Sequence, residues 1–184
     1  ASSGNLLFQN ANGYNIDTVA ADSPVFASAV TGLGAAGNTI ILTTGAGTVT
    51  QSATRNVTAT GLDLRGGAGS YTLTNATNDV ATIAGNTTGV VKYVDAGTLD
   101  VGTLASVGFL GSNDVSLNTQ AGDLTLSQPV NTGVAGTVKL QAAGQVTQAA
   151  AGVITAGTLG VNAGTAVDLS AASVSFTFQP GDRL

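Results

Sequence analysis

The chain lacks histidine, cysteine, methionine and tryptophan, and it contains no glutamate, so all ten of its acidic residues are aspartate. Without cysteine, disulfide bonds and thiolate chemistry are excluded. Only 8% of the residues are charged, whereas a typical soluble domain has about 25%. Glutamate and lysine usually cover exposed helix faces, and aspartate favours turns. The composition therefore predicts an all-β chain with little or no helix.

Positive charge is equally scarce. The cations are Arg55, Arg65, Lys92, Lys139 and Arg183, which are scattered along a chain of net charge −5. Nucleic acids and anionic membranes bind clusters of Lys and Arg, so neither is an expected partner. No apolar run approaches the ~20 residues that span a bilayer, so membrane insertion is not expected either.

The chain has many short alternating strands separated by small residues. The densest series lies within Gly136–Val161, and part of it occurs twice. Thr50–Leu64 aligns with Thr147–Val161 at a constant offset in residue number. Self-similarity at fixed spacing indicates a repeat architecture. We expect one domain, residues 1–184, built from two imperfect long repeats at about 14–113 and 114–184, the second incomplete.

Large aliphatic residues recur at nearly even intervals: Ile40, Leu62, Val80, Leu99, Leu117, Val138 and Leu159. Their spacing of roughly 20 residues suits one coil of a β-solenoid, in which short strands are joined by tight bends. About nine coils stacked ~4.8 Å apart would form a rod on the order of 40 Å long. The sequence thus predicts a parallel β-helix.

Within each coil, triplets such as Leu62-Asp63-Leu64 alternate apolar and polar residues. Alternation places the outer two side chains inside the tube and the middle one in water. Ser23–Val30 is the one segment with a helical signature, since Ser followed by Pro resembles a helix start. It aligns with a later segment that carries Pro129 where a helix interior would be. We therefore expect strand and turn there.

Three motifs lie within Gly136–Val161. They are Gly-Thr-Val-x-Leu at Gly136–Leu140, Gly-x-Val-Thr-Gln at Gly144–Gln148, and Gly-x-Ile-Thr-Ala-Gly-Thr-Leu-x-Val at Gly152–Val161. They resemble the repeat region of filamentous-haemagglutinin-type adhesins, large exoproteins that Gram-negative bacteria export by two-partner secretion. The resemblance extends more loosely over about residues 25–178. It implies a right-handed parallel β-helix that forms a surface rod. The chain shows no counterpart of the amino-terminal secretion motif of such adhesins.

Asp63, Asp100 and Asp168 share the middle position of their strands. Clustered carboxylates serve calcium binding or acid–base catalysis on polysaccharides in some β-helices. Such a cluster needs residues on adjacent coils, and these three are separated by about two and about three and a half coils. Solvated strand faces are therefore the better interpretation. We expect no enzyme, no catalytic or metal-binding residues and no cofactor.

Two other residue patterns invite functional interpretations. Aspartate turns at Gly13–Asp17, Asn78-Asp79 and Asn113-Asp114 fit turn chemistry better than calcium binding. Asn56, Asn75 and Asn86 begin glycosylation sequons, although a chain this rich in Asn and Thr produces such matches by chance.

The expected function is that of a structural, adhesive rod of a secreted or cell-surface bacterial protein, extracellular and contacting host or bacterial glycans or proteins. A second hypothesis is a self-assembling filament subunit, because neither terminal coil shows a clear cap. Val174–Phe178 is still strand-like, and only Gln179–Leu184 interrupts the pattern. The terminal coils would then pair end to end with like coils of the same or a neighbouring chain. A third and less favoured hypothesis is a carbohydrate-active β-helix.

Overall fold

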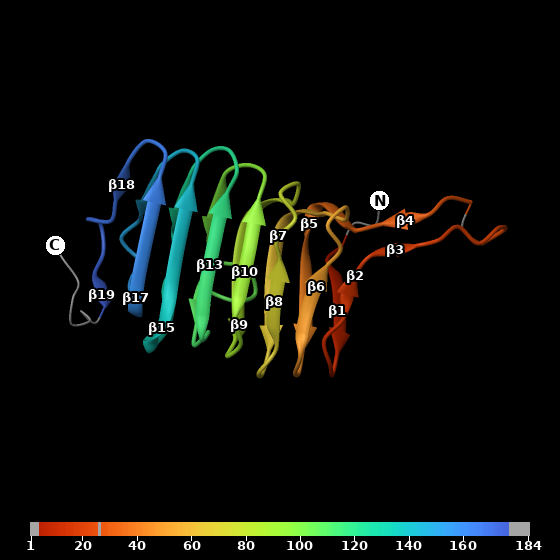
Figure 1. The fold of residues 1–184 in the computed structure, drawn as a ribbon, viewed down its shortest axis with the longest axis horizontal. Helices are drawn as coiled ribbons and strands as arrows, with labels where there is room; N and C mark the ends of the chain where they lie inside the picture. Colours follow the sequence, from red (N-terminus) through yellow and green to blue (C-terminus); the bar gives the residue numbers. More distant parts are fainter. Residues whose placement is uncertain (1–3, 26, 177–184) are drawn as a thin grey trace.

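The computed structural model describes residues 4–25 and 27–176. Over these residues the chain forms a parallel β-solenoid of about seven turns, which confirms the predicted fold class. Figure 1 shows the strands stacked side by side from β1 (Leu6–Asn10) to β19 (Val174–Phe176). The predicted number of nine coils was slightly too high, so the stack is roughly 30 Å long at ~4.8 Å per coil. No described residue lies in a helix, and hence no helix there is long enough to span a membrane.

Each complete coil passes along three faces before the next begins. On the first face, every strand after β2 pairs in parallel with the equivalent strand one coil earlier. One such column runs through Tyr71, Val91, Val115, Val138 and Leu159. The first-face strands are β2 (Asn15–Ile16), β6 (Thr48–Gln51), β8 (Ser70–Leu73), β10 (Val91–Asp95), β13 (Asp114–Thr119) and the second halves of β15 (Val130–Ala142) and β17 (Ile154–Ala163).

The other two faces change their construction along the stack. In the early coils both are formed by long bent strands: β5 (Leu33–Thr44), β7 (Val57–Gly66) and β9 (Asp79–Thr87). In the later coils the second face has its own short strands. The third face of one coil and the first face of the next are formed by a single long strand, β15 or β17. The second-face strands are β11 (Leu99–Val101), β14 (Leu124–Leu126), β16 (Val146–Gln148) and β18 (Val167–Asp168), and the third face continues through β12 (Phe109–Leu110) and β19.

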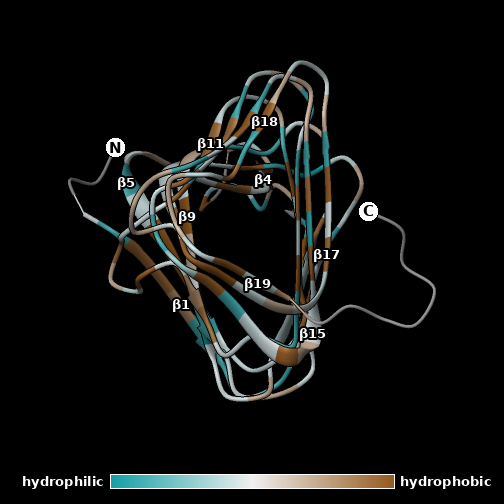
Figure 2. Ribbon diagram, turned by 90° about the vertical axis from the view of Figure 1, so that its left-hand side faces the viewer, coloured by the Kyte–Doolittle hydropathy of each residue, from teal (hydrophilic) through white to brown (hydrophobic). Residues whose placement is uncertain are grey.

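The core is a continuous apolar column inside the coils, and Figure 2 shows the hydrophobic strand residues around it. Leu62, Leu64, Tyr71 and Leu73 are fully buried, as the alternation predicted. In the later coils, five inward residues of the alternating triplets are fully buried: Leu99, Val101, Val115, Leu124 and Leu126. Leu117 is almost completely buried. The predicted triplet at residues 167–169 is an exception: Val167 is 50% exposed and Leu169 is only partly buried, because β18 pairs only with β16 among the described strands.

The predicted anchors are partly misaligned. Ile40 pairs with Leu62 and Val138 pairs with Leu159, as expected. However, Leu62 pairs onward with Ile83, and Val80 instead pairs with Ala59. Leu99 pairs with Leu124 rather than Leu117. The cause is the uneven length of the corners, which the mean spacing of the anchors conceals.

The two aligned segments lie on different faces. Val49 belongs to the first face, whereas Val146, its counterpart at the same offset, belongs to the second. Leu62 similarly lies on a bent strand in the column of Ile83, while Leu159 lies on the first face with Val138. The offset is therefore not a whole number of coils. The repeated segment keeps its strand–turn–strand form but moves one face around the solenoid.

Ser23–Val30 contains no helix among its described residues, as predicted. The chain leaves the coil after β2 and forms an antiparallel hairpin of β3 (Thr18–Val19) and β4 (Val30–Thr31). In Figure 1 this hairpin projects beyond the first coil. Strand β2 nevertheless pairs with β6, so the stack continues past the insertion.

Gly85 lies in an inward-facing column between Leu64 and Phe109. A Cβ atom at Gly85 would lie 2.7 Å from Cε1 of Phe109 and 3.0 Å from the carbonyl oxygen of Leu64. Phe109 is fully buried and fills the space that a side chain at Gly85 would need. The glycine is therefore required by packing.

We predict that Gly85→Ala lowers the free energy of unfolding by about 1–3 kcal/mol through overpacking. Phe109→Leu alone also destabilises the chain, but the double variant should lose less than the sum of the two single losses. Urea unfolding of all four proteins measures this coupling. Strict additivity would show that the ring does not set the requirement for glycine.

Candidate functional site

The structure does not bring Asp63, Asp100 and Asp168 together. Asp100 and Asp168 lie on one ladder with Thr125 and Thr147 between them, so three coil steps, or roughly 14 Å, separate them. Asp168 is exposed and Asp100 is half-buried. Asp63 was expected to face water, but it is fully buried.

Asp63 is covered by the 102–108 loop, the segment between β11 and β12. The backbone N–H of Ser106 donates to Oδ2 of Asp63 at 2.9 Å, and the Ser106 hydroxyl donates to Oδ1 at 2.7 Å. Arg65 adds a 2.7 Å ion pair, and this bond raises the pKa of the guanidinium. Leu104 of the same loop packs over Gly61. Alternation gave the correct outward direction for Asp63, but a loop distant in the sequence covers it.

The three sequon asparagines occupy different environments. Asn86 is exposed beside a hollow of about 480 Å³ that Arg65, Ser106 and Leu110 help to line. Asn75 donates its side-chain amide to the carbonyl oxygens of Ala53 and Arg55 at 2.9 and 3.0 Å. The Asn56 amide donates to the Thr58 hydroxyl at 3.0 Å. Glycosylation at these sites stays a hypothesis.

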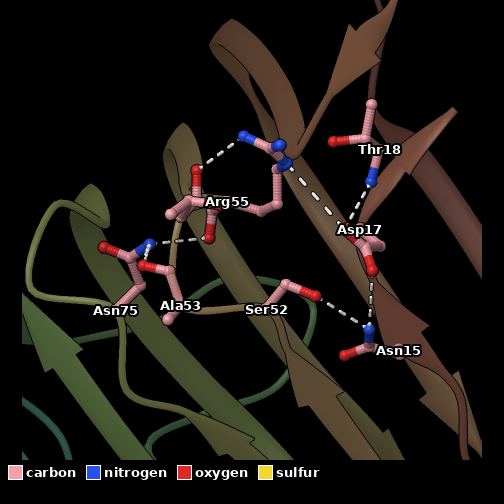
Figure 3. A network of polar contacts seen from close by, with 8 residues as sticks. Asn15, Asp17, Thr18, Ser52, Ala53, Arg55 and Asn75 are labelled. Carbon is pink, nitrogen blue, oxygen red and sulfur yellow. Dashed lines mark hydrogen bonds and ion pairs between the residues drawn. The ribbon is translucent and has the colours of Figure 1, made fainter. Parts of the chain in front are cut away.

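A polar network braces one corner of the first three coils (Figure 3). Asn15 donates to Asp17 at 3.3 Å and to Ser52, in the next coil, at 2.9 Å. Arg55 lies 3.8 Å from Asp17, whose pKa is lowered chiefly by the backbone N–H of Thr18. Asn75 then joins the third coil through the Ala53 and Arg55 carbonyls. Among the aspartate turns considered for calcium, Gly13–Asp17 is thus part of a hydrogen-bonded corner that holds the base of the hairpin.

Asp95 forms a buried corner in the fourth coil. Its carboxylate accepts hydrogen bonds from the N–H groups of Val80 and Gly97 and from the Tyr93 hydroxyl, at 2.8–3.0 Å. Burial nevertheless raises its pKa, and Asp79 adds to the rise. The Tyr93 pKa is raised as well, again chiefly by burial.

A raised pKa in the folded state means that the stabilising contribution of Asp95 is complete below its unfolded value of 3.8 and is lost as pH rises through the folded value. Asp95→Asn removes this titration. We expect the stability of the original chain, relative to the variant, to fall between pH 3 and pH 7 in urea unfolding. A difference that is constant with pH, or that grows in favour of the original chain, contradicts this.

A groove of about 540 Å³ lies on the outside of the first face and is here called the first-face groove. Two ladders of outward side chains form it. One ladder runs Lys92, Ser116, Lys139 and Gly160, and the other runs Val94, Asn118, Gln141 and Asn162. Thr74 also lines the groove.

The two lysines, which looked scattered in sequence, lie on one ladder with Ser116 between them. Both are exposed, and the two ion pairs found in the described part of the chain involve Arg55 and Arg65 instead. No aspartate lines the groove. The sequence signal was present, since the two lysines are about two coils apart, but only the true register places them in line.

The arrangement offers cationic and hydrogen-bonding groups along one face of the sheet. Within residues 4–25 and 27–176, no group of three or more Asp residues is placed to hold a metal ion. The groove supplies two cations, two hydroxyls and three amides on a rigid sheet. In the comparisons with known proteins, no family model, curated protein or solved structure matches the chain.

Proposed function

We propose that this chain is a rod segment of a secreted or surface-attached bacterial protein, and that it mediates contact through the first face. The observation that supports this most is the first-face groove, in which polar side chains repeat in register over four coils. Stacked coils are stiff, so they hold these groups at fixed spacing. The motif resemblance to two-partner-secretion adhesins favours an extracellular location and the same adhesive role.

Retention of protein-coated beads tests this proposal. Beads carrying the folded chain are passed over immobilised bacterial exopolysaccharide and over epithelial cell layers. We expect more retention than with beads carrying heat-denatured chain at equal density. Equal retention of the two on every surface would contradict an adhesive role. Polysaccharide size after incubation is measured in parallel, and shortening would favour the carbohydrate-active alternative.

A filament subunit is the second candidate, favoured by unpaired strand edges. Strand β1 pairs only with β5, and β18 pairs only with β16, among the strands that the structure describes. Leu7 on β1 is 70% exposed. Such edges can accept another strand. Sedimentation at rising concentration tests this: growth that Leu7→Lys suppresses supports a filament, and a concentration-independent monomer contradicts it.

A further inference from the structure

The shape of the first-face groove indicates an elongated ligand. Its lining comes from β8, β10, β13, β15 and β17 or their immediate flanks, so the groove runs along the stack and across the strands. At one end the lysine ladder continues into Gly160, where an added Cβ would meet no atom within 4 Å. Among the described residues no atom blocks that end, so a chain-like ligand has room to extend along the ladder.

Charge and polarity further restrict the ligand. Lys92 and Lys139 are exposed cations, and the other outward groups between them are neutral. Oδ1 of Asn118 is buried in the floor and has no hydrogen-bond donor. Val94 is the one apolar outward side chain of the two ladders. No large apolar side chain projects outward into the groove as a peptide anchor would require, although most of its exposed lining surface is apolar. The lysine, hydroxyl and amide groups named here suit a ligand with acidic and hydroxyl groups.

The spacing of the lysines selects the type of anion. They lie two coils apart, or roughly 10 Å, with hydrogen-bonding groups between them. Nucleic acid carries charge far more densely, about one per 1.7 Å of duplex, and so do heavily sulfated glycans. An extended chain of sugars with one carboxylate each presents carboxylates on one side at every second sugar, a spacing comparable to that of the lysines.

We propose that the first-face groove binds an extended polysaccharide of carboxylated sugars, with Lys92 and Lys139 each pairing one carboxylate. Ser116 and Gln141 face the hydroxyl groups of the intervening sugars. This ligand class rests on the proposed function, because it names what the adhesive face would contact. Binding is weak at each site and gains strength from a long chain that occupies the whole groove.

The test uses oligogalacturonate as the carboxylated probe, neutral dextran, and a heparin oligosaccharide as the sulfated probe, in calorimetry with the full chain. We expect binding to oligogalacturonate that weakens with added salt, and none to dextran. Lys92→Ala with Lys139→Ala should weaken it about tenfold, since exposed ion pairs contribute up to ~1 kcal/mol each. Lys92→Arg with Lys139→Arg should restore most of the affinity.

A charge-matched control separates the groove from net charge. Removing both lysines lowers the net charge from −5 to −7. Gln9→Glu with Ser175→Asp gives the same net charge at exposed outward positions on β1 and β19, and binding should persist. Equal loss in this control, equal binding of dextran, tighter binding of the heparin oligosaccharide, or no effect of the lysine variant would each overturn the proposal.

Bead retention distinguishes the two proposals. If the beads are retained as strongly with the lysine variant as with the original chain, adhesion stands and the groove assignment fails. If the original chain binds oligogalacturonate but its beads are retained no better than denatured controls, the ligand assignment stands and the adhesive role fails.

Discussion

Replacing Asp63 with alanine is expected to lower the free energy of unfolding by about 2–4 kcal/mol, because it leaves a buried N–H group without its acceptor and removes an ion pair whose arginine is partly exposed. Asp63 is fully buried and satisfies both the backbone and the side chain of Ser106. Its removal leaves the Ser106 N–H and the Arg65 guanidinium without their acceptor. The 102–108 loop should then lose its attachment to β7. The change is measured by urea unfolding monitored by circular dichroism.

Asp168→Asn is the matched control, because Asp168 has the same middle position in its strand but is exposed. Its effect should stay within about 0.5 kcal/mol. Hydrogen exchange gives a second readout: the Ser106 amide should exchange faster in Asp63→Ala, while Val138 amide protection is unchanged. If both variants unfold at the same urea concentration and Ser106 stays protected, Asp63 does not hold the loop.

The second large effect is expected for Asn78→Ala. Asn78 is fully buried at a corner. Its Oδ1 accepts from the Val57 N–H at 2.8 Å, and its Nδ2 donates to the carbonyl oxygens of Leu73 and Val94 at 3.2 and 3.1 Å. A reciprocal pair of hydrogen bonds between side-chain amides joins it to Gln51 in the preceding coil. Alanine leaves the Val57 N–H without this acceptor and the side-chain amide of Gln51 without its partner.

Since each unpaired buried group costs about 1–3 kcal/mol, we expect a loss of about 2–6 kcal/mol in urea unfolding. Asn78→Asp should also destabilise the chain, because it keeps the acceptor but removes both donors. The exposed Asn86, changed to alanine, serves as the control and should have little effect. An Asn78→Ala protein as stable as the Asn86→Ala protein would refute a structural role for this corner.

Periodicity predicted the core but not the surface. Alternation correctly placed residues such as Leu62, Tyr71 and Leu126 inside, because burying one strand face in a stack requires a period of two. It could not predict that Asp63 is covered, since the covering loop approaches from outside the strand. Nor could it predict the β3–β4 hairpin, because nothing local indicates that Thr18 pairs with Thr31 outside the coil.

The register of the strands could not be predicted from the sequence either, and without it the lysine ladder of the first-face groove could not be recognised. With a uniform coil of roughly 20 residues, Lys92 would stack on Ser112 and Thr132. The actual steps are longer, because the corners differ in length, and they bring Lys92 into line with Ser116 and Lys139. Corner lengths depend on packing against neighbouring coils. The ladder therefore becomes visible only when the strands are paired.

The displacement of the repeated segment by one face has a consequence for what the rod can touch. Thr50–Leu64 and Thr147–Val161 occur at two heights and on two sides of the same cylinder. A flat, rigid partner reaches only one of these sides at a time. A polysaccharide that lies along the first-face groove therefore meets the later copy and not the equivalent residues of the earlier one.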